Sequence, residues 1–286
     1  TVSWAPITVM MLAVHNLRAQ KTRTMLTALG IVFGVGSVIG MLAIGAGARE
    51  ESLSFIERLG VRNLLIDSRH AASEEELQQR RRSSPGLTER DARTIEANIE
   101  ALETMSPRRI LRPSRLLPKP PGSTHDLYGV RPAYAVIHDL RPDEGQFFDQ
   151  RHEDTSAPVC VLGSNAKVAL LGYAPARGKY IKVNDTWLEV IGVLQETIQA
   201  GSQSRGGQME DLNDVIFVPF NTFQYRFWDM SAYIKDELDG IDLRLKPGVD
   251  SIDTAKVVTA ILNSAHNNTP DFTVTVPAAL LAQQQR

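Results

Sequence analysis

The sequence predicts an α+β protein with one N-terminal transmembrane helix followed by an extracytoplasmic domain. That domain is expected to contain two βαβ units and a small β-rich subdomain inserted between them. Three observations support this prediction. One is an uncharged stretch of 23 residues near the N-terminus, and another is a strand–helix–strand pattern at both ends of the remaining chain. The third is a series of short apolar runs, separated by turn residues, in the middle of the chain.

The predicted transmembrane helix covers residues 25–47, MLTALGIVFGVGSVIGMLAIGAG, which include no Asp, Glu, Lys or Arg. At about 1.5 Å per residue this helix would measure about 34 Å, more than the roughly 30 Å of a bilayer core. Few buried globular helices reach this length without a charge, and the apolar run of a signal peptide is shorter, about 7–15 residues. Two glycine pairs spaced four residues apart, Gly30/Gly34 and Gly36/Gly40, predict close packing against another helix in lipid.

Residues 1–24 are predicted to form an amphipathic segment with a basic end at the cytoplasmic interface. Apolar residues recur there at spacings of three or four, and Arg18, Lys21 and Arg23 follow as membrane-anchoring residues. Within 15 residues of the apolar span, three Lys or Arg lie on each side, so the count alone does not orient the helix. The clustering of the first three, with no acidic residue in residues 1–48, favours a cytoplasmic N-terminus.

Residues 48–120 are predicted to contain a helical stalk and the first βαβ unit. The helix continues over 48–59 with its apolar residues on one face, ends at Gly60, and leads into a strand over 61–67. Residues 68–86, rich in Glu, Gln, Arg and Ser, are expected to form a solvated loop, with a phospholipid-facing patch as the alternative. A helix capped by Thr88 then runs to about residue 102, and a strand follows over 103–110.

Residues 121–220 are predicted to form the inserted β-rich subdomain, because prolines mark its beginning and five apolar runs follow. The runs at 179–183 and 186–194 flank Asn184-Asp185, which indicates a hairpin. The five strands are expected at 126–130, 159–163, 179–183, 186–194 and 215–220. A flexible loop is expected over 199–211, before the last of these strands.

Residues 221–286 are predicted to contain the second βαβ unit. Its strand is expected over 240–248, its helix over 250–264 and its next strand over 271–276, with another helix starting at Pro277. The aromatic residues Tyr225, Phe227 and Trp228 are interpreted as core residues, with a partner or substrate surface as the alternative.

Composition excludes several functions. Lys and Arg number 31 against 33 Asp and Glu, so the basic excess of a nucleic-acid-binding protein is missing. The single cysteine, Cys160, excludes an intramolecular disulfide. The cluster His152-Glu153-Asp154 lacks the His-x-x-x-His spacing of a helical zinc site, and Ser164 lacks the glycine pattern of a nucleophile elbow. No phosphate-binding loop occurs either. The sequence therefore predicts no catalytic, cofactor-binding or metal-binding residue, no cofactor and no enzymatic activity.

The chain resembles the permease subunits of MacB/FtsX-type ABC transporters, and the MacB-like group in particular. The resemblance rests first on NLRAQKTRTMLTALGIVFGVGSVIGMLAIGAGARE, which is similar to the basic elbow and first membrane helix of that family. It also rests on YGVRPAYAVIHDLRPDEGQFF, VCVLGSNAKVALLG, ARGKYIKVNDTWLEVIGVL and DVIFVPFNTF, which follow one another in the family's order. The resemblance as a whole covers essentially all 286 residues.

This resemblance implies a non-catalytic permease subunit of the bacterial inner membrane whose main domain is periplasmic. In that family the two βαβ units form a porter-like subdomain, with halves expected here within 48–120 and 221–286. The implied partners are an ABC ATPase, a second permease copy, membrane lipids and a periplasmic adaptor protein. The implied function couples ATP hydrolysis to a periplasmic conformational change that exports peptides, drugs, lipids or lipoproteins.

Such permeases have four membrane helices, and one is predicted here, so the chain is expected to be a fragment that stops before the second. Two other hypotheses remain open. One is a bitopic protein in which a single signal-anchor helix carries an extracytoplasmic binding or sensory domain. The other is a membrane-anchored enzyme, which is disfavoured because no nucleophile, base and metal ligand converge in the sequence.

Overall fold

The computed structural model describes most of the chain as two compact units, Thr1–Phe55 and Ile56–Arg286. The described residues are 21–58, 62–69, 73–122, 125–197, 204–205, 208–209, 211–227 and 236–277. The predicted amphipathic segment before Lys21, most of the predicted loop at 199–211 and most of the helix predicted from Pro277 lie outside them. So does Trp228.

The first described element is the helix α2 (Lys21–Arg58), which is uninterrupted over 38 residues. It includes one stretch, Met25–Gly45, that is long and apolar enough to cross a membrane. Every residue of this stretch except Gly40, which is half-buried, is exposed within the chain. The prediction of an apolar helix that continues beyond Gly47 is therefore confirmed.

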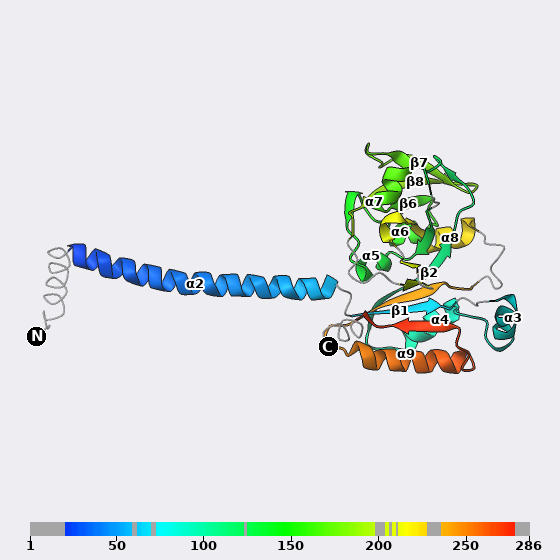
Figure 1. Ribbon diagram of the computed structural model, residues 1–286, viewed down its shortest axis with the longest axis horizontal. Helices are drawn as coiled ribbons and strands as arrows, with labels where there is room; N and C mark the ends of the chain where they lie inside the picture. Colours follow the sequence, from blue (N-terminus) through cyan, green and yellow to red (C-terminus); the bar gives the residue numbers. More distant parts are fainter. Residues whose placement is uncertain are drawn as a thin grey trace, which may run out of the picture. The chain divides into compact units, whose positions relative to one another are not determined.

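The two predicted βαβ units are present, and they are interleaved in one sheet. The first comprises β1 (Asn63–Ser68), α4 (Glu89–Asn98) and β2 (Leu102–Leu111); the second comprises β12 (Gly240–Leu245), α9 (Ser251–Ala265) and β13 (Phe272–Thr275). The strand order is β13-β1-β12-β2, and every neighbouring pair is antiparallel. Each unit's two parallel strands thus have a strand of the other unit between them, which is the split βαβ arrangement of ferredoxin-like folds. Figure 1 shows α4 and α9 together on one side of these strands.

Local sequence explains the helices of this half. Thr88 caps α4 and Asp250 caps α9; the Asp250 carboxylate accepts hydrogen bonds from the N–H groups of Ile252 and Asp253. α4 ends at Asn98, a few residues earlier than predicted, because the backbone turns to an extended conformation at Ile99.

The prediction of a solvated loop over 68–86 is wrong in part, because the helix α3 (Glu74–Ser83) forms within this range. The side chain of Ser73 caps its first turn by accepting from the N–H of Glu76. Glu76 pairs with Arg80 one turn later, and three arginines lie in the last turn, where positive charge complements the helix dipole. The charged composition that suggested a loop is thus the composition of a solvated helix.

The segment between β2 and β12 extends the same sheet. The strand β2 pairs with β12 along its first part and with β4 (Leu127–Val130) along Arg108–Leu111. Beyond β4 the order continues through β11, β6, β8, β7 and β3, and β5 pairs with β8. The added strands are β3 (Leu116–Leu117), β5 (Pro142–Gly145), β6 (Val159–Leu162), β7 (Tyr180–Val183), β8 (Thr186–Leu194) and β11 (Ile216–Pro219). All five predicted strands are confirmed, whereas the subdomain boundaries at 120/121 and 220/221 stay predictions.

The turn predicted at Asn184-Asp185 joins β7 to β8 as a hairpin. Asn184 adopts a left-handed backbone conformation (φ 51°), which Asn tolerates better than most residues. Its side-chain oxygen also accepts from the N–H groups of Ser114 and Arg115. Two short strands, β9 (Ser204–Arg205) and β10 (Gln208–Met209), pair as an antiparallel ribbon within the range where the flexible loop was predicted.

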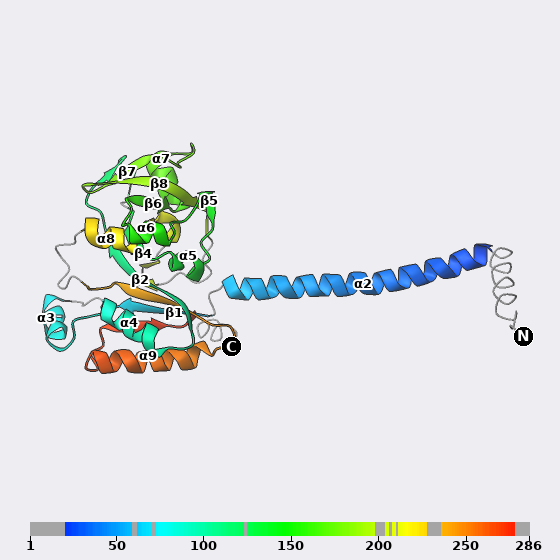
Figure 2. The same ribbon diagram turned by 180° about the vertical axis from the view of Figure 1, so that it is seen from behind.

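Short helices not predicted from the sequence cover this part of the sheet, as Figure 2 shows from behind. They are α5 (Ala133–Ile137), α6 (Gln150–Asp154), α7 (Ser164–Leu171), η1 (Leu212–Asp214) and α8 (Phe220–Arg226). Three apolar clusters result: one beneath α4 and α9, one around the β7–β8 hairpin, α7 and α8, and one around Tyr128, Tyr134 and Phe217.

Candidate functional site

The four predicted helix-packing glycines lie on an uncovered part of α2. A Cβ atom built on Gly30, Gly34, Gly36 or Gly40 meets no heavy atom within 4 Å. At about 100° per residue they occupy an arc of about 160°, so the two pairs lie on neighbouring faces of the helix. A helix with apolar side chains as exposed as Met41 (79%) needs lipid or another helix to cover it. The packing role of the glycines stays a prediction.

The predicted basic anchor is described in part. Arg23 is exposed in the first turn of α2, and Lys21 begins that helix. Arg18 lies outside the described residues. The anchoring role of all three stays a prediction.

The residues considered for chemistry do not converge. His152 contacts Asp149, the side chain of Glu153 accepts from the N–H of Asn221, and Asp154 accepts from Gln150. Within the described ranges, no group of three His, Cys, Asp or Glu residues could hold a metal ion.

The other two candidates serve the packing of the domain. Ser164 donates to Asn213 at the start of α7. Cys160 is fully buried in β6, and burial raises the pKa of its thiol far above the usual value.

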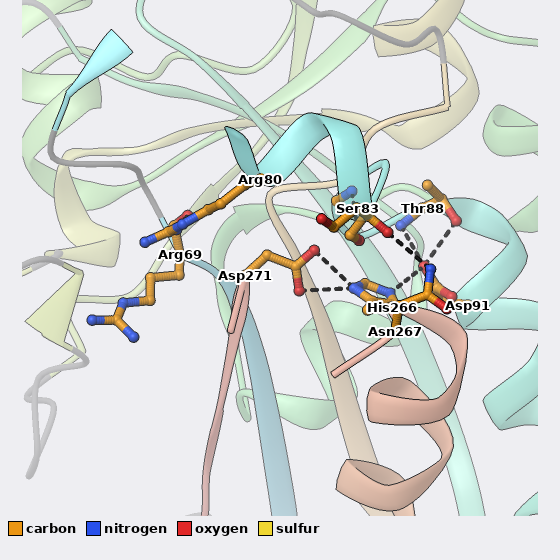
Figure 3. A network of polar contacts seen from close by, with 10 residues as sticks. Arg69, Arg80, Ser83, Thr88, Asp91, His266, Asn267 and Asp271 are labelled. Atoms are coloured by element: carbon orange, nitrogen blue, oxygen red, sulfur yellow. Dashed lines mark hydrogen bonds and ion pairs between the residues drawn. The ribbon is translucent and has the colours of Figure 1, made fainter. Parts of the chain in front are cut away.

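Instead, two buried polar clusters stand out in the domain. The first, which we call the His266 cluster, joins three elements (Figure 3). His266 caps the C-terminus of α9, Asp91 lies in the first turn of α4, and Asp271 immediately precedes β13. Nδ1 of His266 lies 2.8 and 2.9 Å from the two carboxylate oxygens of Asp271, and Nε2 lies 3.2 Å from Oδ2 of Asp91. All three side chains are buried.

Neighbouring groups fix the two carboxylates of the His266 cluster. Oδ2 of Asp91 accepts hydrogen bonds from the backbone N–H and the hydroxyl of Thr88, each at 2.8 Å. The hydroxyl of Ser84 hydrogen-bonds Asp271. Burial alone would raise the pKa values of Asp91 and Asp271, but hydrogen bonds, with those to His266 the largest, lower both.

The second cluster, which we call the Arg108 cluster, lies on the opposite face of the sheet from α4 and α9. Arg108 on β2 is 2% exposed and Asp242 on β12 is fully buried. The Arg108 guanidinium pairs with Asp67 on β1 and lies 3.7 Å from Asp242, and Nε2 of His138 lies 3.4 Å from the other oxygen of Asp242. Gly240 provides the space for this guanidinium, because a Cβ there would lie within 3 Å of it.

Within the Arg108 cluster, the positive charge of Arg108 stabilises the ionised form of Asp242. Burial favours its neutral form, but the charge of Arg108 outweighs this effect and lowers the pKa of Asp242. Neither oxygen of Asp242 accepts a well-formed hydrogen bond from the described residues. Beside the cluster, Asn63 and Arg244 donate to the carbonyl groups of Ile137 and Val136, so the end of α5 is attached to β1 and β12.

Neither cluster was predicted from the sequence. The pattern Thr88-x-x-Asp91 is a capping signal that indicated a helix start, but it did not indicate that His266 would pair with the same carboxylate. Arg108 and Asp242 are charged residues within segments predicted as strands. A charged residue at such a position is the sequence signal that could have indicated a buried ion pair. Among the aromatic residues, Phe227 is core as predicted, whereas that interpretation is wrong for Tyr225, which is 74% exposed.

Together, these features define an α+β domain in which interleaved βαβ units, bridged by buried charged side chains, follow a helix that is long and apolar enough to cross a membrane. Residues 24–284 match the model of the MacB-like periplasmic core domain, and the chain belongs to this family. It is 29% identical to the macrolide export ATP-binding/permease protein MacB of Bdellovibrio bacteriovorus over 252 residues, which cover 88% of this chain and 37% of that protein. It is 31% identical to the protein of the same name from Marinobacter nauticus, over 94% of this chain and 39% of that protein. The chain thus spans less than two-fifths of these two relatives.

Solved structures share the fold. The periplasmic region of MacB from Actinobacillus actinomycetemcomitans matches with a TM-score of 0.60 at 19% identity, covering 81% of this chain and 96% of that one. The extracellular domain of the ABC-type transporter YknZ from Gram-positive bacteria matches with a TM-score of 0.55 at 16% identity, covering 74% and 99%. The α+β fold expected from the resemblance is therefore confirmed.

Proposed function

We propose that this chain is the part of a MacB-type permease that transmits an ATP-driven conformational change from the membrane to the extracytoplasmic domain. ATP binding and hydrolysis would take place on an ABC ATPase, either fused to this polypeptide or separate, and the chain itself would carry no catalytic residue. The exported substrates would be peptides, drugs, lipids or lipoproteins. A periplasmic adaptor protein would be a further partner.

The observation that carries this proposal is the continuity of α2. The helix passes without a break from the apolar stretch Met25–Gly45 to Arg58, and β1 begins five residues later at Asn63. A continuous helix can transmit a displacement along its axis, whereas a flexible linker would absorb it. We place the N-terminus in the cytoplasm and the domain in the periplasm of a bacterium, with the inner membrane between them.

Helix insertion tests the coupling. Four glycines inserted after Arg49 in the full transporter should abolish export while ATP hydrolysis continues, because glycine weakens the helix between membrane and domain. Four alanines at the same point are the matched control, since they keep the helix and rotate it by only about 40°. Equal export by the two variants would contradict the transmission role.

The glycine pairs on α2 are proposed to pack against a membrane helix of the same or a second permease copy. Because a Cβ atom built on Gly34 or Gly40 meets no heavy atom within 4 Å apart from the backbone of the helix itself, Gly34→Leu and Gly40→Leu should not strain the chain itself. Recovery of dimers from membranes should fall in both variants. Ala28→Leu, on the other side of the helix, is the matched control. Unchanged dimer recovery in all three variants would count against this packing.

The reading frame offers the simplest test of the permease assignment. Sequencing the gene beyond Arg286 should find three further apolar spans, with an ATPase frame fused or adjacent. A stop codon close to Arg286 would overturn the proposal in favour of a single-span anchored domain.

A further inference from the structure

The His266 cluster lies at a corner of the domain where several chain segments meet. His266 caps the C-terminus of α9, Asp271 leads into β13 and Asp91 lies in the first turn of α4. The end of α3 reaches the same corner, because Asn267 donates to the carbonyl of Ser83 (Figure 3). β13 is the last strand in its sheet and pairs with β1 alone among the described strands. Its attachment therefore depends on β1 and on the contacts at its start.

The geometry of the cluster favours a protonated imidazole. Nδ1 of His266 is within hydrogen-bonding distance of Asp271, whereas Nε2 faces Asp91 at 3.2 Å as an ion pair without a well-aligned hydrogen bond. Both nitrogens carry a proton toward these carboxylates only in the imidazolium form. A neutral ring would turn one unprotonated nitrogen toward a carboxylate, and the two buried carboxylates would then lack their shared positive charge. His266 is 1% exposed, so water cannot replace the lost partner without movement of the surrounding segments.

The groups that act on His266 come from each neighbouring element. Asp91 on α4 and Asp271 before β13 supply the negative charges. α3 is followed by Ser84, whose hydroxyl hydrogen-bonds Asp271, and the ring of Phe272 on β13 lies edge-on to the imidazole at 5.5 Å between centroids. Arg69 and Arg80 lie on the far side of Asp271: the backbone N–H of Arg69 donates to the carbonyl of Asp271, and the Arg80 guanidinium donates to the carbonyl of Arg69 (Figure 3). Between the two carboxylates themselves, the imidazole of His266 supplies the positive charge.

We propose that His266, Asp91 and Asp271 form an alkaline-sensitive latch, which holds the start of β13 and the adjoining ends of α4 and α9 together. Loss of the imidazolium proton opens this corner while the rest of the domain stays folded. The proposal goes beyond the transport function and does not depend on it, because opening of the latch is a property of the domain alone.

The direction of the pH dependence follows from the titration of His266. Burial acts to lower its pKa, but the hydrogen bonds with Asp271 and Asp91 prevail and raise the pKa from 6.5 to about 9. A group whose pKa is higher in the folded state stabilises fully below its unfolded value and loses that effect as the pH rises to the folded value. The latch is therefore closed near pH 6.5 and weakens between pH 6.5 and about 9.

Hydrogen exchange on the 286-residue chain in detergent tests the latch. Protection factors, corrected for the intrinsic exchange rate at each pH, are compared at pH 6.5 and 9.5 for α4, β13 and, as an internal reference, β6. A shift of the pKa from 6.5 to about 9 corresponds to on the order of a 100-fold change in the opening equilibrium. Protection of α4 and β13 should fall at least about tenfold, whereas that of β6 should stay nearly constant.

Two histidine variants separate the latch from general effects of pH. In His266→Gln the protection of α4 and β13 should already be low at pH 6.5 and should not fall further. His152→Gln, which removes a histidine that pairs with Asp149 elsewhere, should behave as the unmodified chain. Protection that is unchanged between the two pH values in the unmodified chain would overturn the proposal, and so would an equal fall in His266→Gln.

A second measurement keeps the test valid if His266→Gln does not fold. In the unmodified chain with isotope-labelled histidine, the ring of His266 can be assigned by its contact with the ring of Phe272. Its NMR shifts should be those of an imidazolium at pH 7.5. A ring that is already neutral at that pH would overturn the latch.

Discussion

Replacement of Asp242 by Asn gives the most direct measure of how much the Arg108 cluster contributes to the fold. The substitution keeps the shape of the side chain but removes its charge. Asp242 is fully buried and Arg108 is 2% exposed. After the substitution, the Arg108 guanidinium would keep one acidic partner, Asp67, whose side chain is 28% exposed. His138 would lose the same carboxylate.

The expected loss of stability is large. Removing one partner of a buried ion pair costs about 3–5 kcal/mol, because the remaining charge stays buried without full compensation. This is a substantial share of the roughly 5–15 kcal/mol by which a typical folded domain is stable. For a unit of about 150–250 residues, each kcal/mol lowers Tm by about 2–4 °C, so Asp242→Asn should lower Tm by on the order of 10 °C.

Thermal and urea unfolding, followed by circular dichroism in detergent, would measure this effect. Asp139→Asn is the matched control. Asp139 pairs with Arg141 at the surface, where its side chain is 44% exposed, and its left-handed backbone (φ 48°) suits Asn equally well. The control should change the free energy of unfolding by less than about 1 kcal/mol.

A double-mutant cycle isolates the interaction itself. Arg108→Met alone should also destabilise the domain, because it leaves the buried Asp242 with His138 as its one ion-pair partner among the described residues. The double variant should be markedly more stable than the sum of the two single effects predicts, since it leaves neither charge unpaired. The reasoning would be refuted if Asp242→Asn unfolded like Asp139→Asn, or if the two single effects simply added.

Three further predictions concern packing, capping and reactivity. Gly129→Ala should lower the free energy of unfolding by about 1–3 kcal/mol in urea titrations, because the new Cβ would lie 2.5 Å from Cβ and Cγ of Phe223. Asp250→Ala should cost about 1 kcal/mol in the same assay through loss of the N-cap of α9, and an unchanged midpoint would mean that the cap contributes nothing. Cys160 should react with Ellman's reagent only as fast as the domain unfolds, because it is buried and its thiol pKa is raised; rapid labelling of the folded chain would contradict its placement in the core.

The sequence predicted those elements that have a local signal: a long apolar run, a helix cap, or alternation of apolar and polar residues on both sides of a turn. The 23 uncharged residues, the cap at Thr88, and the alternation on both sides of Asn184-Asp185 each indicated an element that the structure contains. Local pattern failed for the short helices: α5, with five residues, is too short to show a helical period. It failed for α3 because a polar, charged composition is shared by solvated loops and solvated helices.

By itself, then, the sequence determined the apolar helix, the βαβ units at both ends and the strands between them, because these follow from interactions between residues close in the chain. Only the tertiary structure decided that β12 lies between β1 and β2, and that His266 lies between Asp91 and Asp271. The physical reason is that strand pairing and buried charge pairing join residues far apart in sequence. Their free energy depends on burial and distance, and neither is encoded in local periodicity.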